Sequence, residues 1–179
     1  MNTGSVLLAA LAAQEACKKL GLAFCVIGGV ALQRWGEPRF TADADISVLV
    51  EAGQELPTAE ALLRELPARI DDALGFAART RVVLARSADN VGINIVLAGL
   101  PFEARVIARA TSWTLGDGHS LQICSAEDLV AMKVFAARDK DWADVTSILE
   151  RQGRKLDLDL IRQELVPLEV VRLSRPNLG

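Results

Sequence analysis

The hydrophobic pattern of the chain changes its period several times, and each change marks an expected element. Apolar residues recur at helical spacing over residues 5–20, and Gly21 follows as a helix C-cap. A short apolar run over 22–27 favours a strand, because it is rich in strand-forming residues and stops at Gly28-Gly29. We expect a short helix over 30–35, directly after the two glycines.

The remaining elements are predicted from the same alternation of apolar runs and turn residues. They are a strand over 44–50, a helix over 58–72, strands over 81–85 and 93–98, a helical segment over 102–110, a hairpin joining 111–115 to 120–124, helices over 126–138 and 141–151, and a last helix over 158–165. Ser125 is the expected N-cap of the helix over 126–138. A tail containing Pro167 and Pro176 should follow the last helix.

This order of elements predicts an α+β fold, with a small mixed β-sheet flanked by helices and a helical C-terminal third. The close spacing of the strands over 81–85 and 93–98 indicates that they pair antiparallel. The length of 179 residues lies in the range of one domain. We therefore expect a single domain with a core over about 20–150 and a helical extension over about 125–179.

Composition narrows the possible partners. The formal net charge is −3, which excludes a broadly basic surface for nucleic acid. RNA contacts would need a local patch of basic residues, and the candidates are Arg34, Arg39, Lys133, Arg138 and Lys140. Three distant cysteines and one histidine exclude a zinc site and a disulfide framework, and favour a reducing compartment. No apolar run reaches 18 residues, so we expect no membrane span and no membrane partner. The apolar stretch over 6–13 resembles the core of a signal peptide, but no Lys or Arg precedes it and it continues as an amphipathic helix, so we predict a cytoplasmic protein.

Two aspartates provide the first candidate chemistry. Asp43 and Asp45 stand two apart at the entry to a strand, so their side chains should share one face, about 7 Å apart at Cα. Side-by-side carboxylates repel, and one takes up a proton unless a cation lies between them. A pair of Mg²⁺ ions would remove that repulsion and bind a triphosphate. The alternative interpretation is two solvated carboxylates at a strand end.

The residues around this pair point to phosphate binding. Gly28-Gly29 break a strand just before a helix, which leaves backbone N–H groups free for an anion. Arg39 and Thr41 add a cation and a hydroxyl just ahead of the carboxylates. Each feature also has a plain interpretation: the glycines as a tight turn, and the two polar residues as ordinary surface chemistry.

Taken together, these residues resemble a known family. The matching stretches are Gly28-Gly29-Val30-Ala31-Leu32, Arg39 to Asp45 in the pattern Arg-x-Thr-x-Asp-x-Asp, the segment 125–133 ending in Lys133, and 137–144 with Asp141 and Asp144. This order is similar to that of the nucleotidyltransferase superfamily. More narrowly, it is similar to that of the small abortive-infection-type nucleotidyltransferases, several of which are toxins of toxin–antitoxin pairs. The resemblance covers roughly residues 20–150.

The resemblance implies a role for each matched residue. Asp43 and Asp45 would bind Mg²⁺ and the triphosphate of an NTP, and Gly28 and Gly29 would cradle phosphate. Lys133 would contact the triphosphate, since a lysine acts as a point charge against phosphate. A solvated helix residue is the alternative interpretation of Lys133.

One position departs from the family pattern. The third carboxylate, which helps to activate the acceptor hydroxyl, should lie in the strand over 91–97, where this chain has Asn94. An amide oxygen binds a metal weakly and cannot act as a base. Asp89 lies five residues earlier and would face the other way unless a bulge near Gly92 turned it.

Two functional hypotheses follow. In the first, the protein moves NMP from an NTP to a hydroxyl acceptor, which would be RNA (tRNA in particular), a protein or a small molecule, and it is the toxin partner of an antitoxin protein. In the second, Asn94 marks a catalytically degenerate nucleotidyltransferase fold that binds or regulates. A structural domain with no retained site is a third interpretation.

Overall fold

The computed structural model describes residues 3–173, and these form eight α-helices, one 3-10 turn and six strands. The helices are α1 (Thr3–Lys19), α2 (Gly28–Trp35), α3 (Glu55–Glu65), α4 (Ala73–Thr80), α5 (Pro101–Ala108), α6 (Ala126–Ala136), α7 (Asp139–Gln152) and α8 (Leu158–Leu173), with the 3-10 turn at Gly153–Lys155. The strands are β1 (Phe24–Ile27), β2 (Asp43–Leu49), β3 (Val82–Arg86), β4 (Gly92–Ala98), β5 (Thr111–Thr114) and β6 (Ser120–Ile123).

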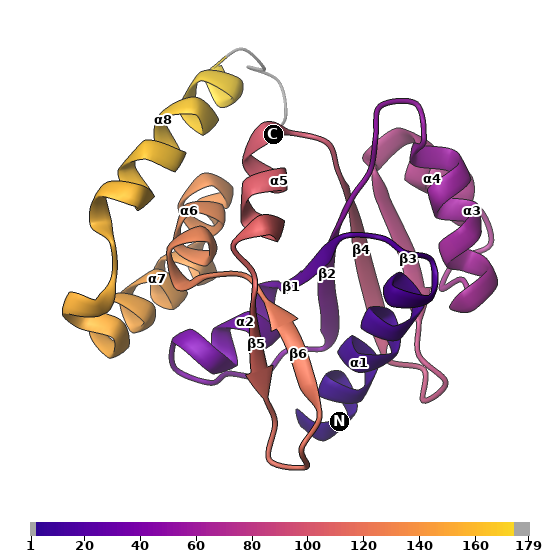
Figure 1. Ribbon diagram of the computed structural model, residues 1–179, viewed down its shortest axis with the longest axis horizontal. Helices are drawn as coiled ribbons and strands as arrows, with labels where there is room; N and C mark the ends of the chain where they lie inside the picture. Colours follow the sequence, from indigo (N-terminus) through magenta and orange to yellow (C-terminus); the bar gives the residue numbers. More distant parts are fainter. Residues whose placement is uncertain (1–2, 174–179) are drawn as a thin grey trace.

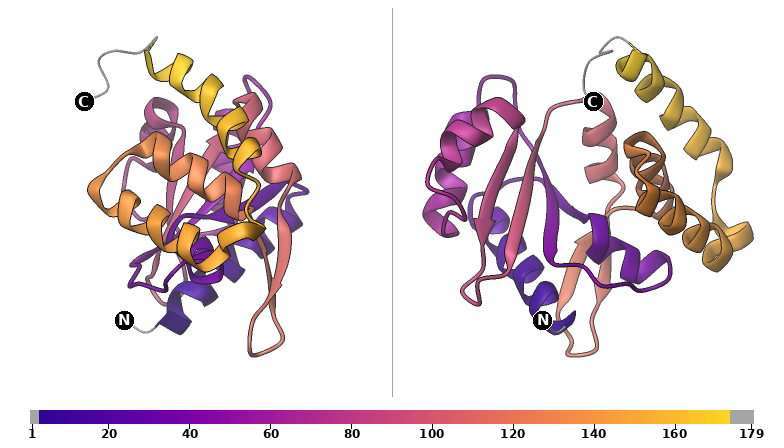
Figure 2. Two further views of the ribbon diagram at one scale, coloured as in Figure 1. Left: turned by 90° about the vertical axis from the view of Figure 1, so that its left-hand side faces the viewer. Right: turned by 180° about the vertical axis from the view of Figure 1, so that it is seen from behind.

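The strands form one mixed sheet in the order β3-β4-β2-β1-β6-β5, which confirms the α+β prediction. β3 and β4 pair antiparallel, and β5 and β6 form the expected hairpin. β2 pairs parallel with β4 and antiparallel with β1. Figures 1 and 2 show α3 and α4 beside β3 at one end of the sheet, with α6, α7 and α8 grouped at the other end.

The sheet register places the candidate carboxylates at one level. Asp45 on β2 lies opposite Ile27 on β1 and opposite Asn94 on β4. Asp43, one step along the same face, lies opposite Gly92. Ala44, between them on β2, points to the other face, where it is buried in the core. The alternation of β2 thus presents the two aspartates together on one side of the sheet.

A buried polar cluster attaches the C-terminal helices to the rest of the protein. Ser125 caps α6 as predicted, because its hydroxyl accepts from the backbone N–H of Asp128 at 3.0 Å. Asp128 has no exposed surface and accepts a hydrogen bond at 2.5 Å from Arg109, the residue that directly follows α5. Glu164 on α8 accepts from Arg105 and Arg109 at 2.6 and 2.9 Å. These charged pairs join α5, α6 and α8.

Two helix predictions are wrong in extent. The helix expected over 58–72 is in fact α3, which ends at Glu65. Pro67 forces Leu66 into an extended conformation, and α4 follows as a separate helix. The last helix continues beyond 165 to Leu173 and contains Pro167, since its packing against the protein outweighs the local preference to end. The expected tail at Pro176 lies outside the described residues.

No helix of the described segment 3–173 is long and apolar enough to cross a bilayer. The core consists mainly of aliphatic side chains from α1, α2, the central strands and α6. All three cysteines are buried, and burial raises the pKa of the Cys17 and Cys25 thiols to about 12. These thiols therefore belong to the core, consistent with the sequence interpretation of free cysteines.

Candidate active site

A cleft of about 510 Å³ opens on the aspartate side of the sheet, between the β1–α2 junction, β2, β4 and the α6–α7 junction. Its lining includes all eight residues selected from the sequence, which are Gly28, Gly29, Arg39, Thr41, Asp43, Asp45, Asn94 and Lys133. Arg138, Lys140 and Asp141 complete its polar wall. Arg34, the fifth basic residue of the expected patch, instead binds Thr111 through its guanidinium.

Asp43 and Asp45 differ in their surroundings. The Asp43 side chain is 41% exposed, whereas Asp45 lies deeper against the β1–α2 junction. Burial raises the pKa of Asp45 above its usual range, and the charge of Asp43 raises it further. A hydrogen bond from Asn94 and the backbone N–H of Gly29 only partly offset these effects. The pair therefore carries the mutual repulsion that a bound cation would relieve.

Three glycines allow close approach around the carboxylates. Gly28 has φ +64°, and a Cβ there would collide with the Asp45 carboxylate. A Cβ at Gly29 would collide with the Thr41 side chain, and one at Gly92 would collide with the Asp43 carboxylate and the Arg69 guanidinium. Gly28 and Gly29 thus do more than turn the chain, since they admit the side chains of the site itself.

Arg69 is a site residue that the sequence interpretation missed. It lies between α3 and α4, and its guanidinium donates to Asp43 Oδ1 at 3.1 Å and to Asn94 Oδ1 at 2.8 Å. The Asn94 amide nitrogen then donates to Asp45 Oδ1 at 2.9 Å. The four side chains form a continuous hydrogen-bonded chain across β2 and β4. Gly92, which lies beside the Asp43 and Arg69 side chains, is the one feature of the sequence that could have indicated their close approach.

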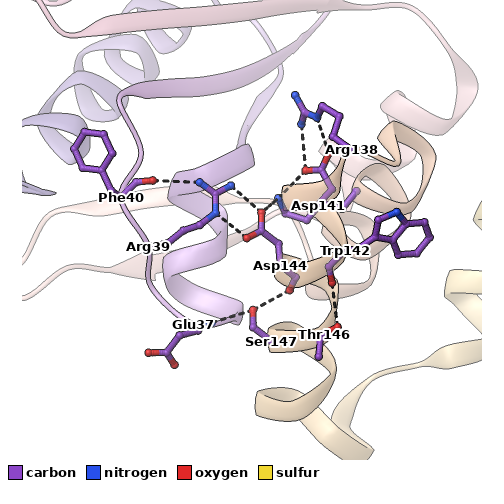
Figure 3. A network of polar contacts seen from close by, with 10 residues as sticks. Glu37, Arg39, Phe40, Arg138, Asp141, Trp142, Asp144, Thr146 and Ser147 are labelled. Carbon is purple, nitrogen blue, oxygen red and sulfur yellow. Dashed lines mark hydrogen bonds and ion pairs between the residues drawn. The ribbon is translucent and has the colours of Figure 1, made fainter. Parts of the chain in front are cut away.

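A second network lines the opposite wall of the cleft (Figure 3). Arg39 donates to both carboxylate oxygens of Asp144 at 2.7 and 2.8 Å. Lys133 donates to Asp144 at 2.6 Å and approaches Asp141 at 3.5 Å. Arg138 pairs with Asp141 at 2.6 Å. Three cations against two carboxylates leave this network with one net positive charge facing the cleft.

These contacts settle how the network is charged. Burial alone would raise the pKa of Asp144, but hydrogen bonds from Arg39 and Lys133 outweigh it and lower the pKa. The pKa of Asp141 is lowered in the same way, with burial opposed by Arg138 and then Lys133. The hydrogen bond that Arg39 donates to Asp144 is the largest cause of the raised pKa of Arg39. Both carboxylates are thus held ionised.

Two sequence alternatives are corrected by the structure. Lys133 is not a solvated helix residue: its side chain is only 6% exposed and lies between two carboxylates. Asp89 is exposed in the turn between β3 and β4, and β4 pairs regularly from Gly92, so no bulge turns Asp89 toward the cleft. Asn94 therefore stands where the sequence placed it, beside Asp45.

The donor set suits a magnesium ion that arrives with a nucleotide. Mg²⁺ is usually held by one or two carboxylates, with water and substrate phosphates completing its shell. Asp43 and Asp45 can supply the two carboxylates. Within residues 3–173 no group of three or more His, Cys, Asp and Glu side chains gathers as a metal site. In a typical magnesium site, phosphate and water supply the ligands that carboxylates do not.

The fold matches solved nucleotidyltransferase structures. The solution structure of the antibiotic-resistance factor ANT(2″)-Ia has a TM-score of 0.60 at 17% identity, covering 97% of this chain and 96% of that one. A complex of ANT(2″)-Ia with adenylyl-2″-tobramycin gives 0.53 at 14% identity, covering 94% and 98%. An antigenic nucleotidyltransferase-like protein from Paracoccidioides brasiliensis gives 0.56 at 16% identity, covering 99% and 92%. At these identities the likeness establishes the fold alone.

The sequence comparisons are more specific at the family level. No curated protein sequence matches the chain. Residues 9–172 match the family described as "Nucleotidyl transferase AbiEii toxin, Type IV TA system". The match spans nearly the whole chain, including every residue of the cleft. The chain therefore belongs to the AbiEii nucleotidyl transferase toxin family.

Proposed function

We propose that this protein is a Mg²⁺-dependent nucleotidyltransferase, which moves NMP from an NTP to a hydroxyl acceptor and releases pyrophosphate. The observation that supports it most is the convergence of Asp43 and Asp45 with four cationic side chains on one cleft of about 510 Å³. That volume falls in the range of small-molecule sites, roughly 300–1,000 Å³. A cleft with carboxylates on one wall and cations on the other suits a metal-bound triphosphate.

In this proposal the two walls have different tasks. Asp43 and Asp45 hold the metal, which when bound neutralises charge on the phosphates and polarises the reacting phosphoryl group. The net positive network of Arg39, Lys133 and Arg138 faces the phosphate oxygens. The Arg138 side chain is 62% exposed, so its guanidinium can turn toward a ligand while the α6–α7 junction stays in place.

In this proposal, the N-terminus of α2 and the Thr41 hydroxyl also contribute to phosphate binding in the cleft. Gly28 and Gly29 open α2 beside the carboxylates. The Gly29 N–H binds Asp45, and the N-terminal end of the helix favours an anionic group there. The acceptor hydroxyl oxygen bonds to the α-phosphorus and gives up its proton to water or to a phosphate oxygen of the nucleotide. The bond from the α-phosphorus to the bridging oxygen of the β-phosphate breaks, and pyrophosphate departs. Such transfer depends mainly on positioning and electrostatics, so it persists without a third carboxylate at a reduced rate.

The family membership supports a toxin function, so we propose that the protein acts in the cytoplasm and is restrained by an antitoxin protein. The acceptor classes that remain under this proposal are RNA such as tRNA, a protein and a small molecule. Asn94 favours a second candidate, a nucleotide-binding protein that transfers nothing, because its amide cannot accept the acceptor's proton.

The first test is the melting temperature of the protein with Mg²⁺ and each NTP. Ligand at 100 times its dissociation constant stabilises by about 2.7 kcal/mol, which for this size corresponds to roughly 5–10 °C. We expect that shift in the wild type, and its loss in the Asp43→Asn/Asp45→Asn variant. Asp89→Asn is the matched control, since Asp89 is exposed near the site but outside the cleft.

The outcomes separate the candidates. A Mg²⁺-dependent shift that the double variant loses leads to a transfer assay with labelled NTP, and labelled acceptor then supports the enzyme. Nucleotide binding without transfer to any of the three acceptor classes favours the binding protein. A wild type that shows no shift with any NTP contradicts both.

A further inference from the structure

Arg69 is held in place by backbone contacts with the edge of the sheet. Its N–H donates to the carbonyl of Leu84 at 2.9 Å, and the N–H of Arg86 donates to the carbonyl of Pro67 at 2.9 Å. Residues 67–69 therefore extend the sheet by a short stretch beside β3. Because Leu84 lies opposite Asn94, the Arg69 side chain starts level with the site and reaches across β3 and β4.

The guanidinium ends between two of the site's acceptors. It binds Asp43 Oδ1 at 3.1 Å and Asn94 Oδ1 at 2.8 Å, one through each terminal nitrogen. A guanidinium stays charged at every pH the protein meets, and its planar fork suits two acceptors at once. The Arg69 side chain is 31% exposed, so the site keeps this charge at its rim.

The surrounding residues fit this arrangement. A Cβ on Gly92 would collide with the Asp43 carboxylate and with the Arg69 guanidinium, so this glycine makes room for their contact. Asn94 offers its oxygen to Arg69 and its nitrogen to Asp45. A carboxylate at position 94 would accept from Arg69 but lacks the N–H that Asp45 requires, and it would add a third negative charge.

We propose that Arg69 supplies, as a permanent charge between Asp43 and Asn94, the positive charge that a second divalent cation would otherwise bring. The site then takes one divalent cation with its nucleotide instead of two. Asn94 is the matched partner of Arg69 in this arrangement, and its amide keeps the local charge balanced. This inference rests on the proposed function, since it concerns the metal content of that same site.

Counting bound metal tests the inference without any activity assay. Equilibrium dialysis of the full chain against Mn²⁺ with a saturating non-hydrolysable NTP analogue measures Mn²⁺ per bound nucleotide. We expect one Mn²⁺ for the wild type and two for the Arg69→Met/Asn94→Asp variant. We expect Asn94→Asp alone to bind one, because Arg69 still stands beside Asp43. In the double variant, loss of the Arg69 charge should lower the dissociation constant of the first Mn²⁺ by at least about tenfold.

Controls separate this inference from a folding defect. Arg86→Met removes an arginine from the neighbouring edge strand, where its guanidinium binds Asn90, and it should leave one Mn²⁺. Circular dichroism must show that each variant melts cooperatively. Two Mn²⁺ in the wild type or in Asn94→Asp, or one in the folded double variant, overturns the inference. No Mn²⁺ in the wild type overturns the proposed function itself, and this inference with it.

Discussion

The Asp45 carboxylate sits against Gly28 and beside Asp43, in surroundings that disfavour its charge. Because its pKa is raised on folding, ionised Asp45 costs stability, and this cost appears as the pH rises from about 3.9 through the folded pKa. Asp45→Asn keeps the shape and removes the charge. We expect the metal-free variant to be more stable at pH 7 by about 1 kcal/mol, or roughly 2–4 °C.

Thermal melts in EDTA measure this effect. The gain should shrink as the pH falls through the folded pKa of Asp45, because the wild-type carboxyl then takes up a proton and loses its charge. Asp89→Asn is the matched control, since Asp89 is exposed and lies outside the cleft, so it should bring no gain. A lower melting temperature for Asp45→Asn at pH 7 would contradict a destabilising charge. If the gain is found, the charge of Asp45 lowers the stability of the metal-free protein and serves metal binding instead.

At the level of elements, the attachment of α8 depends on a few charged contacts. Glu164 is almost fully buried and accepts from Arg105 and Arg109. Glu164→Gln keeps the volume but removes the charge that both guanidinium groups bind. We expect a loss of about 2 kcal/mol in the free energy of unfolding, because hydrogen bonds to charged groups contribute roughly 1.5–3 kcal/mol.

Hydrogen exchange locates that loss. Amides of α8 should exchange faster in Glu164→Gln, while those of β2 and β4 keep their protection. Arg162→Gln is the control, because its pair with Asp159 is exposed and should contribute less than about 1 kcal/mol. Equal loss of protection in the central strands would show that α8 does not open separately.

Elements also show what local sequence can predict. The succession of helices and strands along the chain, the β3–β4 pairing and the Ser125 cap follow from short-range patterns, and the structure has them. The helix expected over 58–72 failed because Pro67 outweighed its apolar spacing. The helix expected over 158–165 was predicted too short because of Pro167, whereas α8 continues through this proline. Local rules describe local preference, and tertiary packing decides between competing preferences.

The site divides in the same way. Asp43, Asp45 and the paired glycines lie within 18 residues of one another, so their pattern is visible in the sequence. Arg69 reaches Asp43 and Asn94 over separations of 26 and 25 residues, through the register of three strands. Nothing near Arg69 in the sequence marks that contact. The burial of Lys133 likewise depends on α7 folding back against α6.

For the whole molecule, the net charge of −3 conceals an uneven distribution. Four basic side chains gather at the cleft, where they outnumber its three aspartates; they are Arg39, Lys133, Arg138 and Lys140. Three buried carboxylates, Asp141, Asp144 and Glu164, are held ionised by these and other cations. The same ion pairs that shape the cleft therefore link the stability of the whole protein to pH.

The sign of this link follows from the direction of the shifts. The pKa values of Asp141, Asp144 and Glu164 are lowered on folding, so their stabilisation is complete above the ordinary values of about 3.9 and 4.3. It is lost as the pH falls through the folded pKa values. Asp45 opposes this trend, but it is one group against three. We expect the free energy of unfolding to decline from about pH 5 downward.

Urea unfolding at pH 3 to 7 tests this with Asp144→Asn. The variant should lose about 2–3 kcal/mol at pH 7, because Arg39 and Lys133 lose a charged partner. Its curve should then fall less steeply than that of the wild type as the pH decreases, because only the wild type loses the stabilising charge of Asp144 as that carboxylate takes up a proton. Asp71→Asn, at an exposed loop position, should follow the wild type. Parallel curves for Asp144→Asn and wild type would show that Asp144 does not couple folding to pH. The acid sensitivity would then come from Asp141 and Glu164. The cleft network would in that case depend on the geometry of its hydrogen bonds more than on the charge of Asp144.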